Sequence, residues 1–170
     1  MKKLILSIVA ACVCFAASAE IVLPRVLGSN MVLQQQSEIN LWGKADADKK
    51  VNVTVSWNKK KITTRSDKDG NWAVKVPTPA GSFEKHTITI SDGEKITLDN
   101  ILIGDVWVCV GQSNMEMPVQ GYMHQPVENA MTYIRRGSAM KDKIRMFTVK
   151  KARSYDKDLD DCVGEWRESS

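Results

Sequence analysis

Apolar and polar residues alternate in short runs between Ile21 and Ile103. Val51, Val53, Val55 and Trp57 are separated by polar residues, and the same two-residue period recurs from Trp72 and at Ile88 and Ile90 before Asp92-Gly93. This period is typical of strands that are buried on one face. Turn dipeptides such as Asp69-Gly70 and Asp92-Gly93 interrupt the runs. The pattern predicts a small antiparallel, jelly-roll-like β-sandwich over residues 20–103.

A different pattern begins at Ile101, where the apolar residues become contiguous as far as Val110 apart from Gly104-Asp105. A continuous apolar run is typical of a strand that is buried on both faces of a parallel sheet. The run ends at Gly111, and Ser113 follows. We therefore expect a buried strand over Val106–Val110, a sharp turn, and a serine in the crevice where open α/β sheets bind ligands.

A helix and a second strand are predicted downstream of this turn. Pro126 suits the first position of a helix, and apolar residues from Val127 to Ile134 follow at helical spacing, with Gly137 as a cap. Ile144–Val149 has the composition of a strand, which completes a βαβ start. A long polar stretch follows Lys150 without a further element, so we expect residues 104–170 to form the first part of a truncated α/β domain.

The first nineteen residues have the features of a secretory signal peptide. Lys2-Lys3 precede the apolar run Leu4–Phe15, and Ala17-Ser18-Ala19 provides a cleavage site. The apolar run is too short to span a membrane. We expect the protein to be periplasmic or secreted, and lipid anchoring at Cys12 is the less favoured alternative.

Charge and composition exclude few functions. The formal net charge of +4 becomes +2 once the two lysines of the signal are removed, which provides no basic surface for nucleic acid. No metal cluster or cofactor motif is present, so neither is expected. Cys109 and Cys162 remain in the mature chain, and two unpaired thiols are favoured although their pairing stays open. The sequence does not determine the oligomeric state.

The residues around Ser113 are similar to those of a known family. The block Gly111–Met115, with Val106-Trp107 before it and Pro118 after it, resembles the nucleophile block of the sialate O-acetylesterases, which are SGNH-type hydrolases. Further landmarks follow in the family's order: Leu23-Pro24, Asn30–Gln34, Trp42-Gly43, Asp69–Trp72 and Gly104–Trp107. The resemblance covers the amino-terminal part of such an enzyme, from about Ile21 to Val149.

The resemblance implies a carbohydrate O-acetyl ester hydrolase that removes acetyl groups from sialic acid or related sugars. Ser113 would be the nucleophile, and no cofactor would be needed. The family takes its catalytic histidine and acidic residue from a later block, so the triad is expected to be incomplete in this chain. An esterase of acetylated plant polysaccharide, or a non-catalytic β-sandwich that binds carbohydrate or another protein, are the alternatives.

Three neighbouring residues are candidates for supporting roles. Gln112 and Asn114 could support the turn or donate to an oxyanion, although asparagine is also common in turns for conformational reasons. A serine nucleophile needs a base, and His124 is a candidate because it lies eleven residues after Ser113. His86 shares a strand face with apolar residues, so we expect it to be structural.

The tryptophans and the acidic turn allow two interpretations each. Trp42, Trp57, Trp72 and Trp107 could stack on sugars, but core packing is favoured, and Trp107 is expected inside the buried strand. Asp67–Asn71 has oxygen-bearing side chains at alternate positions, as in a calcium loop, but a β-turn fits its glycine better.

Overall fold

The computed structural model describes residues 20–169 of the 170-residue chain. The predicted signal peptide, residues 1–19, and the alternative lipid anchor at Cys12 lie outside the described residues. Within residues 20–169, no helix has the length and apolar character needed to cross a membrane. The fold is dominated by strands, with a curled sheet and a single α-helix among these residues.

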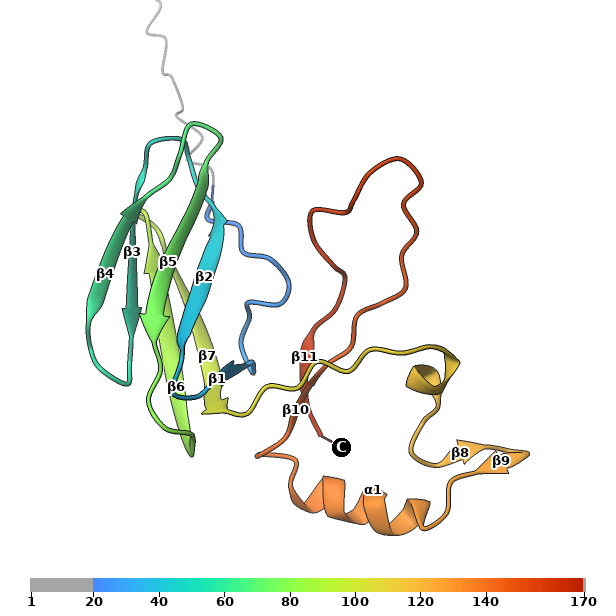
Figure 1. Ribbon diagram of the computed structural model, residues 1–170. Helices are drawn as coiled ribbons and strands as arrows, with labels where there is room; N and C mark the ends of the chain where they lie inside the picture. Colours follow the sequence, from blue (N-terminus) through green and yellow to red (C-terminus); the bar gives the residue numbers. More distant parts are fainter. Residues whose placement is uncertain (1–19, 170) are drawn as a thin grey trace, which may run out of the picture.

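One sheet of five strands forms the larger layer of the fold (Figure 1). Its strands in spatial order are β1 (Val32–Gln34), β7 (Lys95–Gly104), β6 (Ser82–Ser91), β3 (Lys50–Val55) and β4 (Lys61–Arg65). Neighbouring strands are antiparallel except β1 and β7, which are parallel. The strand predicted from alternation at 88–90 is confirmed, and the one predicted at 51–57 is confirmed as far as Val55, after which the chain turns.

The second sheet consists of β2 (Glu38–Lys44) and β5 (Asn71–Pro77), which pair antiparallel along their whole length. Leu41 on β2 and Val74 and Val76 on β5 are buried and join one apolar core with Val53 and Ile90 of the five-stranded sheet. Burying such a side chain fully contributes roughly 1.5–3 kcal/mol. Both sheets therefore depend on the same core.

Two glycine-containing turns take the conformations that the sequence predicts. Gly70 and Gly93 have φ values of +80° and +138°, which side chains with a Cβ atom rarely adopt. The Asp67 carboxylate accepts hydrogen bonds from the backbone N–H groups of Asp69 and Asn71, at 2.9 and 2.7 Å. The acidic segment is thus a turn, and no group of three metal-binding side chains occurs among residues 20–169.

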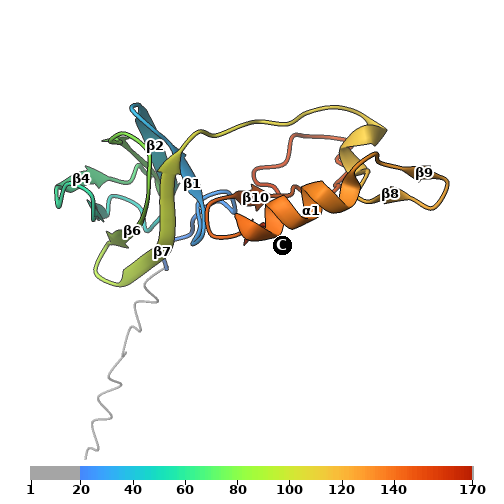
Figure 2. The ribbon, with the colours of Figure 1, turned by 90° about the horizontal axis from the view of Figure 1, so that it is seen from below.

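Residues 105–169 begin with a long extended stretch, and short elements follow it (Figure 2). In chain order the elements are the 3₁₀ helix η1 (Ser113–Glu116), β8 (Gly121–Tyr122), β9 (Gln125–Pro126), α1 (Ala130–Ala139), β10 (Arg145–Phe147) and β11 (Trp166–Glu168). β8 pairs with β9 and β10 pairs with β11, both antiparallel. The division into a module ending at residue 103 and a second domain from residue 104 stays a prediction.

The prediction of a buried strand over Val106–Val110 is wrong. This stretch has no strand structure, and the side chains of Trp107, Val108 and Val110 are 84%, 86% and 84% exposed. A strand of this composition needs neighbours on both edges and cover on both faces. Within the described part of the chain, no strand pairs with it, so it runs extended in solvent.

The predicted βαβ start is also wrong in its pairing. β10 lies inside the predicted strand Ile144–Val149, but its partner is β11, which is antiparallel to it and comes from the end of the described chain. α1 starts at Ala130 because Pro126 is held in β9 opposite Gly121. Local periodicity found these segments but could not identify their long-range partners.

The expectation that the tryptophans pack in the core holds only in part. Trp72 is 3% exposed, and Trp57 is partly buried with its Nε1 donating to the Pro77 carbonyl at 3.0 Å. Trp42 is 42% exposed, and Trp107 lies in the open stretch described above. The reason for Trp42 is its position on the outer face of β2, where the inner-facing Leu41 fills the core instead.

Candidate functional site

Two glutamine side chains form hydrogen bonds to the segment that follows β7 and leads to Ser113. The Gln34 Oε1 atom accepts from the Val106 N–H at 2.9 Å, and the Gln35 amide donates to the Asp105 carboxylate at 2.9 Å. The Gly81 N–H in turn donates to Gln35 Oε1 at 2.7 Å. These contacts join three separate segments, so they fix the direction in which residues 105–112 depart from the sheet.

Ser113 is the first residue of η1, at the end of the extended stretch. The backbone N–H of Met115 donates to the Gln112 carbonyl at 3.0 Å, and that of Met117 donates to the Asn114 carbonyl at 3.3 Å. These two bonds make the sharp turn that the sequence predicts. Ser113 is exposed, and among the described residues its hydroxyl has no hydrogen-bond partner. The hydroxyl is therefore accessible but not activated by a neighbouring base.

Gly111 lies close to the Met115 side chain. A Cβ atom at this position would lie 2.9 Å from Cγ of Met115. Met115 is half exposed and flexible, so it could move to relieve such a contact. A side chain at position 111 could therefore be accommodated by a shift of Met115.

Gln112 and Asn114 flank Ser113 on the exposed surface of η1. Neither side-chain amide has a hydrogen-bond partner among residues 20–169, and Gln112 does not cap η1 through its side chain. An amide donates two N–H groups. The geometry leaves both side chains available to a ligand at Ser113, and their predicted supporting roles remain predictions.

The two histidines have different surroundings. His86 is buried, its Nδ1 lies 3.3 Å from the Ser56 hydroxyl, and its ring contacts that of Trp57 edge-on at 5.5 Å. His86 is therefore structural, as the sequence predicts. His124 lies in the exposed two-residue loop between β8 and β9, and no hydrogen bond joins it to Ser113 in the described chain.

Two contacts connect η1 to later segments of the chain, and the sequence does not predict either of them. The Glu116 carboxylate forms an ion pair with Lys151, and the Tyr122 hydroxyl donates to the Glu116 carbonyl at 3.3 Å. The first contact ties η1 to the loop between β10 and β11, and the second ties it to the β8–β9 hairpin. Both groups of the ion pair are exposed, so the link is weak.

A buried arginine connects β10 to the sandwich. The Arg145 side chain is 0% exposed and donates to the Glu168 carboxylate at 3.1 Å. It also donates to the side-chain Oδ1 atom of Asn100 at 3.3 Å. The Asn100 amide donates to the Asn30 side-chain oxygen at 2.6 Å. This network joins β10 and β11 to the turns of the sandwich. Sequence reasoning missed it because its members are far apart in the chain.

The carboxyl groups with a lowered pKa belong to local turns and hairpins. Hydrogen bonds from the side chain and then the backbone of Asn71 lower the pKa of Asp67 below its ordinary value. Hydrogen bonding and then the charge of Arg167 lower the pKa of Glu165. Neither residue is near η1 in sequence or bonded to it, so these pKa shifts report local structure.

Both cysteines of the described chain are free thiols, as favoured from the sequence. Cys109 is exposed, which corrects the expectation that it is buried in a strand. The correction has the same cause as that for Trp107, because both residues lie in the unpaired stretch.

Comparison with known proteins finds homologues of this chain. No family model matches the chain. The sialate O-acetylesterase of Rattus norvegicus is 31% identical over 147 residues, which are 80% of this chain and 26% of the rat protein. The chain is a homologue of the sialate O-acetylesterases. The Mus musculus sialate O-acetylesterase is 31% identical over 142 residues, 78% of this chain and 25% of its own length. The chain thus spans about a quarter of these relatives.

A solved structure that resembles this sialate O-acetylesterase homologue is also described as an acetylesterase. XAC1771, described as a novel carbohydrate acetylesterase from Xanthomonas citri, superimposes with a TM-score of 0.76 at 25% sequence identity. The match covers 89% of this chain and 33% of XAC1771. The similarity therefore includes both the sandwich strands and most of residues 105–169.

Proposed function

We propose that this protein is a carbohydrate O-acetyl ester hydrolase of the sialate O-acetylesterase type, with Ser113 as its nucleophile. The observation that carries the proposal is the sequence relationship to sialate O-acetylesterases over 80% of the chain. The XAC1771 match supports acetylated carbohydrate as the substrate class. The exposed Ser113 hydroxyl at the start of η1 supports the choice of nucleophile.

The proposed chemistry is acyl transfer in two steps. The Ser113 Oγ atom bonds to the acetyl carbonyl carbon while a base takes its proton, and the sugar oxygen leaves with a proton as its ester bond breaks. Water then attacks the acetyl-serine, releasing acetate and restoring the hydroxyl. The Ser113 backbone N–H, with the amides of Gln112 and Asn114 as candidates, would donate to the oxyanion. No metal or cofactor takes part in these steps.

His124 is the candidate base that this chain offers, because its other histidine, His86, is buried against Ser56. Catalytic hydrogen bonds are often formed only when substrate binds, so the unbonded state of His124 does not exclude it. We predict that His124→Ala lowers the turnover number by about 10²- to 10⁴-fold. Unchanged turnover would show that His124 takes no part in the mechanism. The substitution His86→Gln, at the buried histidine, tests separately whether a loss of turnover can come from a disturbed fold.

The experiment that tests the function is acetate release by the purified protein. The substrates are 9-O-acetylated N-acetylneuraminic acid and acetylated xylan, at matched acetyl concentration, with deacetylated xylan as the blank. Release from the sialic acid alone supports the sialate specificity. Faster release from xylan favours the plant polysaccharide alternative, and no release from either would contradict esterase activity of these 170 residues.

The protein is further proposed to act outside the cytoplasm. The support is the signal-like pattern of residues 1–19, and cell fractionation with detection of the mature chain beginning at Glu20 tests it. Recovery of an uncleaved chain from the cytoplasm would contradict this proposal.

A further inference from the structure

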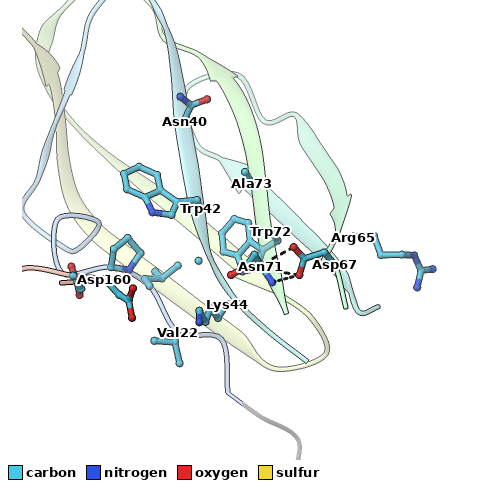
Figure 3. A pocket seen from close by; sticks show the side chains of 14 residues that line it. Val22, Asn40, Trp42, Lys44, Arg65, Asp67, Asn71, Trp72, Ala73 and Asp160 are labelled. Carbon is cyan, nitrogen blue, oxygen red and sulfur yellow. Dashed lines mark hydrogen bonds between the residues drawn. The ribbon is translucent and has the colours of Figure 1, made fainter. Parts of the chain in front are cut away.

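A pocket of ≈ 920 Å³ lies against the outer face of the two-stranded sheet, on the sandwich and not at η1 (Figure 3). β2 and β5 form its base, and Val22 to Pro24 line one side. Asp160 and Asp161, from the loop between β10 and β11, also line it. A concave space built from three segments is a candidate for ligand binding.

Trp42 presents an open aromatic ring in this pocket. It lies on the outer face of β2, is 42% exposed, and is paired in register with Ala73 of β5. A methyl group cannot cover an indole ring. The residues of β2 on either side on the same face are Asn40 and Lys44, both exposed and both lining the pocket. The aromatic ring is therefore flanked by hydrogen-bonding side chains.

The inner face below Trp42 is fixed. A Cβ atom on Gly43 would lie 2.4 Å from the Val22 carbonyl oxygen and 3.1 Å from Cζ2 of Trp72. Val22 and Lys44 exchange two backbone hydrogen bonds, at 2.9 and 2.8 Å, at the edge of β2. Packing on one side and pairing at the edge hold the strand, so the position of Trp42 is set before any ligand binds.

The polar groups of the pocket carry both signs of charge. Lys44 and Arg65 are cationic, whereas Asp67, Asp160 and Asp161 are anionic. The Asp161 carboxylate accepts from the Arg25 N–H at 3.2 and 3.0 Å, which holds the loop against the sandwich. With acidic groups in the majority, the pocket does not favour an anionic ligand.

Trp72 borders the pocket from the inner face of β5. Its side chain is 3% exposed, and its Nε1 atom has no acceptor among the described residues. Because Trp72 faces the core together with Val74 and Val76, its N–H is not a contact for a ligand stacked on Trp42.

We propose that this pocket binds the neutral pyranose units of a polysaccharide. One face of such a ring carries apolar C–H groups, which suit the negatively polarised face of Trp42 and bury apolar area against it. The hydroxyl groups at its edge match the amide of Asn40 and the ammonium of Lys44. The site is separate from Ser113 and its binding needs no ester, so it does not depend on the proposed reaction.

Isothermal titration of the Ser113→Ala protein tests the proposal without hydrolysis. The neutral probes are xylohexaose, cellohexaose and mannohexaose, and the anionic probe is a trimer of N-acetylneuraminic acid. We expect at least one neutral probe to bind more tightly than the anionic one. Tighter binding of the anionic trimer, or no binding of any neutral probe at millimolar concentration, would overturn the proposal.

Variants in the Ser113→Ala background locate the site. Trp42→Ala should weaken binding of the neutral probe by about tenfold or more, because the stacking surface is lost. Ala73→Arg should weaken it similarly by covering the indole. Trp107→Ala, which removes an exposed tryptophan outside the pocket, should change affinity less than about twofold. Equal affinity in Trp42→Ala and Ala73→Arg would overturn the assignment, and unchanged thermal midpoints control for folding.

Discussion

At the scale of single residues, Asp67 shows how one side chain fixes a turn. Its carboxylate accepts from two backbone N–H groups and from the side-chain amide of Asn71, the latter at 3.1 Å. These bonds favour the charged form, so the pKa of Asp67 lies below its ordinary value. The folded state is therefore stabilised relative to the unfolded chain wherever the carboxyl is ionised in both.

The pH dependence of this stabilisation gives a prediction. A lowered folded pKa contributes stability that is present above the unfolded value, near pH 4, and lost as pH falls through the folded pKa. Asp67→Ala should therefore lower the thermal midpoint at pH 7, and the difference from the native sequence should shrink below about pH 4. Asp69→Ala, an exposed neighbour whose side chain has no hydrogen bond among the described residues, is the control. A pH-independent difference would show that another property of Asp67 matters.

The sequence predicts single residues well where the cause is local. The turn at Gly70 follows from the dipeptide Asp69-Gly70, and the turn at Gly93 follows from Asp92-Gly93. It fails for Trp42 and Trp107, whose exposure depends on which strands cover them. Residue type alone cannot tell a tryptophan that packs from one that faces a pocket.

At the scale of elements, β10 and β11 depend on Arg145. Their three-residue pairing is too short to be stable alone. The buried Arg145 guanidinium bonds to Glu168 of β11 and also to the Lys141 carbonyl at 2.9 Å. Trp166 adds a hydrogen bond from Nε1 to the Val26 carbonyl at 2.8 Å. Contacts with the sandwich and with the segment after α1 thus hold the pair.

Removing the arginine should release this pair. We predict that Arg145→Ala lowers the local free energy of opening by about 2 kcal/mol, because bonds to a charged group are lost and Asn100 and Glu168 lose a partner. Amide exchange in β10 and β11 would then accelerate roughly 30-fold. Arg167→Ala, which removes an exposed ion pair between β11 and the preceding residue Glu165, should change exchange little. Equal effects of the two substitutions would contradict a special role for Arg145.

Elements with internal periodicity were predictable, whereas those defined by distant partners were not. β3, β5 and β6 show alternation that survives in the fold. The helix was found but begins at Ala130, because Pro126 and Asn129 take other conformations. β11 had no signal in the sequence, since its three residues become a strand only beside β10.

At the scale of the whole molecule, the apolar side chains of the sandwich core are shielded from solvent, whereas those of the stretch after it are exposed. Val51, Val53 and Val55 are completely buried, whereas the apolar run Val106–Val110 is exposed. Exposed apolar runs of this kind mark contact surfaces or aggregation-prone segments. The described residues thus contain one well-covered core and one apolar segment without cover.

Hydrogen exchange should show this contrast directly. We predict strong protection of amides in Val51–Val55, whose hydrogen bonds lie in a central strand, and little protection in Val106–Val110. The exposed apolar run should also make the protein associate as its concentration rises, and the substitution Val108→Asp should reduce this association. Equally strong protection in both segments would show that the apolar run is paired in solution.

The chemistry of Ser113 is the central claim, and acetate release by matched serine variants tests it most directly. The native sequence, Ser113→Ala and Ser138→Ala, the last an exposed serine of α1, are compared on the better of the two acetylated substrates. We predict that Ser113→Ala loses about 10³-fold or more of the turnover number and that Ser138→Ala keeps it. Undiminished acetate release by Ser113→Ala would contradict the assignment of Ser113 as the nucleophile.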